Sequence, residues 1–160
     1  MQSNTLLRQQ VVSLLKGKEA HADFDAAIEN LPAAARGKRP KGAEHSPWQI
    51  LEHLRIAQWD ILEFAVDPKH KSPDWPEGYW PKTLAPKSVT EWDASVKNFR
   101  RDLKRLCDLV ASESTDLLAK IPHGDGQTIL RQALLAADHN AYHLGELVLV
   151  RRLLGAWQPS

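Results

Sequence analysis

Two histidines four residues apart are the most chemically suggestive feature of the sequence. His139 and His143 lie in the stretch ADHNAYHLGE, residues 137–146, within an alanine- and leucine-rich run that is typical of a helix. One helical turn separates the two imidazoles, so both can reach one ion. Imidazole nitrogen suits zinc, nickel, copper or iron better than magnesium or calcium. The pair predicts a transition-metal site; the alternative is that both side chains hydrogen-bond to backbone or to a carboxylate.

A divalent ion needs a third protein ligand, because two ligands leave it too open to be held well. At about 100° per residue, both histidines project on the side of their helix that carries Leu135, Val150 and Leu153, which we expect to face inward. Glu146 and Tyr142 lie on the same side, so we expect them to face inward as well. His53 is the best third ligand, since it flanks the apolar stripe of an expected helix over residues 47–66. For the remaining histidines we expect surface or capping roles: His21, His45, His70 and His123.

Several familiar catalytic patterns are excluded by spacing. A zincin protease needs Glu directly after the first histidine, and Asn140 stands there. Carboxylate-bridged di-iron bundles need Glu-x-x-His pairs, and the sequence contains none. It also lacks a serine nucleophile elbow, a P-loop and a Rossmann glycine pattern.

The elements that must position these histidines are helical almost throughout. Apolar periodicity and helix-end signals predict helices over about 4–16, 20–30, 47–66, 89–110 and 128–154. Ser46 and Pro47 form a typical helix start. Residues 67–87 contain five prolines and several aromatic residues, so we expect an irregular connection there. The sequence predicts an all-α, four-helix bundle with an extra N-terminal helical segment and a long Pro/Trp-rich loop between the second and third main helices.

Composition narrows the class of protein further. The chain has 160 residues, which suits one domain over 1–160. Its net charge of +1 gives no general attraction to nucleic acid or to an anionic membrane. We find no apolar run of membrane-spanning length and no signal peptide at the start. The single cysteine, Cys107, fits a reducing cytoplasm.

Two motifs together resemble the DinB/YfiT-like superfamily: SPWQILEHL, residues 46–54, and DHNAYHLGE, residues 138–146. The resemblance spans nearly the whole chain. Members are four-helix bundles, commonly dimers, that hold one divalent metal, often nickel or zinc, on three histidines. The resemblance implies that His139 and His143 are ligands, because HLGE is similar to the family's His-x-Gly-Gln/Glu continuation.

The first motif departs from the family pattern. Aligning Trp48 and Glu52 with the family's Trp-x3-Glu places the expected third ligand on Ile56, which cannot bind metal. His53 lies three residues earlier, nearly one turn along the same helix. We therefore predict that His53 replaces the family ligand.

The resemblance implies a metal-dependent enzyme acting on a small molecule. Characterised relatives activate a low-molecular-weight thiol, so a thiol S-transferase is the favoured activity, with a hydrolase as another possibility. Glu146, Asp60 and Tyr142 are candidates for holding the ligands or handling protons. For Glu146 and Tyr142, hydrogen bonding at the edge of the core is the alternative.

A second hypothesis belongs to another class. The chain would be a non-catalytic bundle that binds or senses metal and acts through a homodimer interface. Trp48 and Trp59, which the helical wheel places outward, would contribute to that surface.

Overall fold

Five α-helices form the body of the computed structural model, which describes residues 2–17 and 20–157. They are α1 (Gln2–Lys16), α2 (Phe24–Ile28), α3 (Pro47–Val66), α4 (Val89–Ala111) and α5 (Ile129–Leu153), with short 3₁₀ turns at Ala33–Ala35 (η1) and Glu77–Tyr79 (η2). Among the described residues, β structure is limited to one isolated bridge. The predicted all-α class is therefore confirmed.

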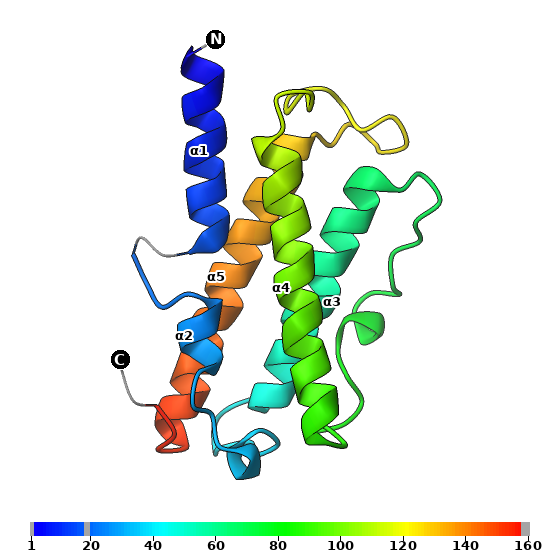
Figure 1. The fold of residues 1–160 in the computed structure, drawn as a ribbon. Coiled ribbons are helices and arrows are strands. Elements are labelled where there is room, and N and C mark those ends of the chain that lie inside the picture. The colour runs from blue at the N-terminus through cyan, green and yellow to red at the C-terminus, as the bar shows by residue number, and fades with distance from the viewer. Residues whose placement is uncertain (1, 18–19, 158–160) are drawn as a thin grey trace.

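The helices form a bundle in which α1 and α2 follow one another along the same side (Figure 1). α3 packs against both α4 and α5, and α1 packs on the other side of α4 and α5. α2 follows α1 toward the opposite end of the bundle and packs on α5. Its Phe24 stacks on Phe99 of α4 with 3.9 Å between ring centroids. The extra N-terminal segment thus completes the bundle as a broken helix.

The helix predicted over 20–30 is much shorter in the structure. α2 begins only at Phe24, because the Asp23 side chain accepts a hydrogen bond of 2.8 Å from the Ala26 N–H and caps the helix there. At the other end, Asn30 has a φ of +55°, which no helix accommodates. The apolar pattern and the helix-end signals behind the prediction indicated neither of these ends.

α3 starts where the sequence predicts, but one of its side chains that was expected to be exposed is buried. Ser46 and Gln49 form a capping box, and Pro47 occupies the first turn. Trp48, expected to point outward, is only 3% exposed, and its indole N–H donates to the Thr83 hydroxyl at 3.2 Å. That expectation was wrong because the long connection after α3 folds back over this side of the helix.

This α3–α4 connection, residues 67–88, runs back beside α3 toward the start of α4 (Figure 1). Side chains of α3 hold it: Asp60 accepts hydrogen bonds from His70 and Tyr79, and Trp48 donates to Thr83. Side-chain hydrogen bonds thus hold this irregular segment, which the sequence predicts, against the face of α3 that carries His53.

The apolar core is divided into two parts along the bundle. One part joins α1 to the C-terminal half of α3, and the other joins α2 to the N-terminal half of α3. Between them, the buried Gln58 donates to the Phe99 carbonyl and accepts from Asn140, both at 2.8 Å. We call Gln58 and Asn140 the amide pair. Across the described residues, no helix is both long and apolar enough to cross a membrane.

Candidate metal centre

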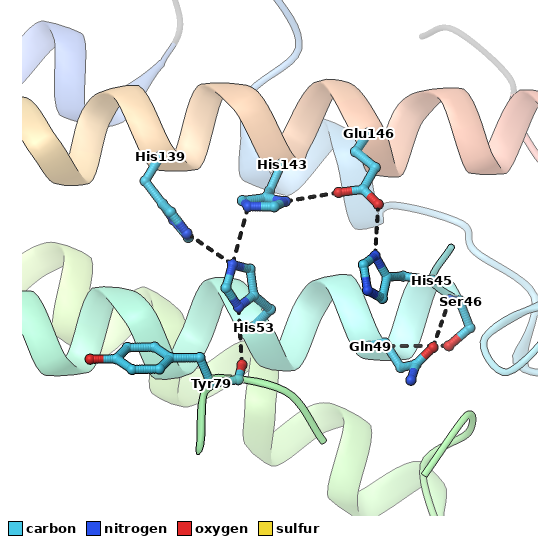
Figure 2. Close-up of polar contacts among 8 residues, drawn as sticks. All are labelled: His45, Ser46, Gln49, His53, Tyr79, His139, His143 and Glu146. Carbon is cyan, nitrogen blue, oxygen red and sulfur yellow. Dashed lines mark hydrogen bonds and ion pairs between the residues drawn. The ribbon is translucent and has the colours of Figure 1, made fainter. Parts of the chain in front are cut away.

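Three histidine side chains from α3 and α5 converge at one point (Figure 2). The Nε2 atom of His53 lies 3.0 Å from Nε2 of His139 and 3.1 Å from Nε2 of His143. One nitrogen from each ring lies within 4.8 Å of the other two. The structure therefore brings together the residues predicted as ligands, and it does so with the His53 side chain, while Ile56 offers no ligand atom.

Two of the three rings have a fixed tautomer. Nδ1 of His53 lies 3.0 Å from the Tyr79 carbonyl oxygen, which only accepts, so this nitrogen carries the hydrogen. Nδ1 of His143 likewise donates to the Glu146 carboxylate at 2.8 Å. In their neutral forms, both rings then present a bare Nε2 lone pair to the centre.

These lone pairs make the cluster suited to a cation. Facing lone pairs at 3.1 Å repel each other unless a positive charge lies between them. A hydrogen on Nε2 of His139 would satisfy one contact with His53, but it would leave the contact between His53 and His143 unsatisfied. Tetrahedral coordination at about 2.0–2.1 Å would place ligand nitrogens about 3.3 Å apart. The two distances to His53 are close to this value, and all three nitrogens lie within 4.8 Å of one another. Three imidazole nitrogens are also the donors that zinc and nickel prefer, so the residues present fit a divalent ion.

The electrostatic environment favours the neutral form of two of the rings. Burial lowers the pKa of His53 to about 4, with the neighbouring His143 acting in the same direction. Burial also lowers the pKa of His139, to about 3, and the two other imidazoles reinforce the shift. His53 and His139 are thus neutral near neutral pH, and neutral imidazole is the form that binds metal.

Glu146 joins two histidines on the exposed side of the cluster. One carboxylate oxygen accepts from His143, and the other accepts from Nδ1 of His45 at 3.1 Å. Despite burial, which raises its pKa, the two histidines bring the net pKa of Glu146 below its usual value. Glu146 is therefore an ionised acceptor that holds one predicted ligand in orientation.

The contacts that His45 and Trp80 make at the cluster were not predicted from the sequence. The Trp80 ring stacks on His45 at 3.8 Å and on His53 at 3.9 Å between centroids. His45 had been expected in a surface or capping role. It precedes α3, and Trp80 lies in the irregular connection, so helical periodicity carries no signal for either contact.

Neither of the other two candidate groups holds a ligand in the way that Glu146 does. Asp60 contacts none of the three rings directly and instead accepts from His70 and Tyr79, both at 2.7 Å. His70 therefore has a buried partner, contrary to the surface role expected for it. Tyr142 touches the edge of His143, with centroids 4.9 Å apart, but it is 73% exposed. Its expected inward position was wrong.

The helical-wheel prediction for α5 took Leu135, Val150 and Leu153 as markers of the buried face, and two of these three residues are exposed. Leu135 and Leu153 are 37% and 55% exposed, and only Val150 of that set is buried. The face of α5 toward the core instead includes small residues such as Ala133 and Ala136. His139 and His143 consequently lie half-buried at the seam with α3 rather than at the centre of the bundle.

The fold and this site define a helical-bundle protein with a histidine cluster between two neighbouring helices. A family model described as the DinB superfamily matches residues 17–147. The chain belongs to the DinB superfamily. No curated protein and no solved structure matches it. Family membership and the possible three-histidine site agree with a metal-associated protein.

Proposed function

We propose that the chain binds one divalent ion, zinc or nickel, through Nε2 of His53, His139 and His143. The observation that carries the proposal is the contact at 3.1 Å between two nitrogens whose hydrogens are committed elsewhere. Glu146 and the Tyr79 carbonyl fix the two rings from behind, as partners of metal-binding histidines commonly do.

We further propose that this centre serves a thiol-dependent S-transferase acting on a small electrophile. A bound ion would supply Lewis acidity, lowering the pKa of a thiol at a coordination position that three protein ligands leave open. In the transfer, the thiol sulfur bonds to the electrophilic carbon, the leaving group departs with the bonding electrons, and the thiol proton passes to water. The buried His53 and the Trp80 ring keep solvent from one side of the centre.

The test of the metal proposal begins with protein purified without a histidine tag. We expect about one equivalent of zinc or nickel per chain, and its loss in a His143→Ala variant. His123→Ala is the matched control, because His123 contacts the carbonyl and the ring of Phe64, away from the cluster. A metal-free wild-type protein that also fails to take up either ion would contradict the proposal.

The activity is tested by combining several low-molecular-weight thiols with electrophilic substrates. Turnover that requires both the thiol and the loaded ion, and that is lost in His143→Ala, would support the transferase. Absence of turnover in every combination, with the ion bound, would contradict it.

The second candidate function is metal sensing or binding without catalysis, through a homodimer. Its specific support is an exposed apolar stripe on α5: Leu135, Tyr142, Leu149 and Leu153, which are 37–73% exposed. Tyr142 belongs to this stripe and touches His143. We propose that two copies of the chain pair through this stripe, whether the protein is an enzyme or a metal-binding protein without catalytic activity. Sedimentation of the wild type against a Leu149→Glu variant tests the pairing, and a monomeric wild type would refute it.

We also propose that the protein acts in the cytoplasm. Cys107 is free and buried, as expected for a thiol in a reducing compartment. Fractionation of cells that express the protein would test this.

A further inference from the structure

Asp60 is a buried carboxylate whose two oxygens are both used by the α3–α4 connection. It is 9% exposed and lies two helical turns beyond His53 on α3. One oxygen accepts from Nε2 of His70 at 2.7 Å, and the other accepts from the Tyr79 hydroxyl at 2.7 Å. The His70 side chain is itself 7% exposed and lies edge-on against Trp59. One carboxylate thus fixes the connection at two places nine residues apart.

Tyr79 transmits this anchoring to His53. Its side chain is held by Asp60, while its own carbonyl oxygen accepts the Nδ1–H of His53 at 3.0 Å. The next residue, Trp80, stacks on the same imidazole with an interplanar angle of 1°. Two consecutive residues of an otherwise irregular segment therefore control both the tautomer and the plane of His53.

We propose that Asp60, acting with Tyr79 and His70, is the positioning group that sets His53 to present Nε2 for metal binding. The inference rests on the proposed metal site, and it assigns Asp60 a role without contact with the ion. If the Tyr79 hydroxyl is removed, the connection loses its anchor next to the carbonyl that fixes the tautomer. His53 then populates the form with hydrogen on Nε2, which cannot bind metal.

The chemistry of the anchor agrees with this role. Burial and the hydrogen bond with Asp60 raise the pKa of Tyr79 to about 12, so its hydroxyl remains a donor at neutral pH. A buried carboxylate with two short hydrogen bonds holds its partners more firmly than a neutral acceptor does. A different side chain of α3, Trp48, also bonds the connection, at Thr83, and this contact does not lead to His53.

The experiment compares Tyr79→Phe and Asp60→Asn with Thr83→Val as the matched control. Zinc affinity of the full chain is measured by competition with a chelator, and the His53 tautomer is measured in the metal-free protein by ¹⁵N NMR of the imidazole nitrogens. We expect zinc affinity to fall by about 10- to 100-fold in both test variants and by less than threefold in the control. We expect Nδ1–H in the wild type and the control, and a mixture of tautomers in the test variants.

The outcomes separate this inference from the proposed function. If the wild type binds zinc and Tyr79→Phe binds it equally well with an unchanged tautomer, the positioning role is overturned and the metal site stands. If the wild type binds no zinc, the metal site is overturned, and this inference falls with it. Should Asp60→Asn fail to fold, the more conservative Tyr79→Phe decides alone. A uniform loss in all three variants would show general destabilisation of the connection and would overturn the specific role of Asp60.

Discussion

Two polar clusters join α3 to α5, and they use their hydrogen-bonding groups in opposite ways. In the amide pair, each contact joins an N–H to an oxygen: Asn140 donates to Gln58, which donates to the Phe99 carbonyl. In the histidine cluster, nitrogen faces nitrogen at 3.0 and 3.1 Å. The first arrangement pairs donors with acceptors and leaves the buried Asn140 Oδ1 without a partner, whereas the second places lone pairs face to face, and a cation between them would complete it.

The difference shows how a structural polar layer can be distinguished from a binding site. Burial does not distinguish them, since Gln58 is 0% exposed and His53 only 3%. What distinguishes them is whether the donors and acceptors match. We therefore expect changes in the histidine cluster to alter metal affinity, and changes in the amide pair to alter folding stability alone.

The largest expected effect is the loss of metal affinity in His53→Ala. Removing one of three ligands leaves the ion with two, so we expect zinc affinity to fall at least about 1,000-fold, roughly 4 kcal/mol. Chelator competition measures the change. If this variant bound zinc as tightly as the wild type, the histidine cluster would not be a metal site, and its distinction from the amide pair would be lost.

The next effect is a pH dependence of stability in the metal-free protein. The pKa of His53 is about 4 in the folded chain against 6.5 in the unfolded chain, so the unfolded chain takes up the proton first as pH falls. Stability is fully present above pH 6.5 and falls as the pH is lowered, by about 2–3 kcal/mol down to a pH of about 4.5. His139, with a still lower pKa, adds to the loss.

Urea unfolding after chelator treatment measures this pH effect. A His53→Gln variant should show a flatter profile over the same range. A wild-type profile that stays flat between these pH values would show that the cluster accepts protons easily, contrary to its burial.

A moderate effect is expected when the amide pair is broken. Gln58→Leu leaves the buried Asn140 amide without its acceptor, so we expect the free energy of unfolding to fall by about 2 kcal/mol. Zinc affinity should change less than threefold. If zinc affinity fell as far as in His53→Ala, the amide pair would belong to the metal site and the comparison would fail.

The smallest effect is expected from Glu146→Gln. The amide oxygen can still accept from His143, but the negative charge is lost, so we expect zinc affinity to fall by about tenfold. Glu63→Gln on α3 is a suitable control, because this glutamate pairs with Arg105 away from the cluster. Equal effects from the two substitutions would argue against a specific role for Glu146.

Helical periodicity was sufficient to predict the bundle and to place His53 opposite the pair on α5. The family pattern pointed to Ile56, yet the position of His53 on the flank of the α3 stripe identified the side chain that reaches the pair. Periodicity indicates which residues share one side of a helix. It places His139 and His143 one turn apart on α5, and His53 beside the apolar stripe of α3.

The surroundings of the cluster were not predictable in this way. His45, Tyr79 and Trp80 reach His53 or Glu146 from irregular segments, where the contacts depend on how the chain folds back over α3. Tyr142 was misplaced because bulky apolar residues were taken to mark the inner face of α5. That face contains several alanines, which let the helices approach closely, while some leucines remain outside.

The most direct test of the central claim is X-ray absorption spectroscopy on the untagged protein loaded with zinc. The claim predicts three imidazole nitrogens at about 2.0–2.1 Å, with one or two further light ligands. It also predicts two imidazoles in the His139→Ala variant. A spectrum without imidazole scattering, or one unchanged by that substitution, would contradict the assignment of His53, His139 and His143 as the metal ligands.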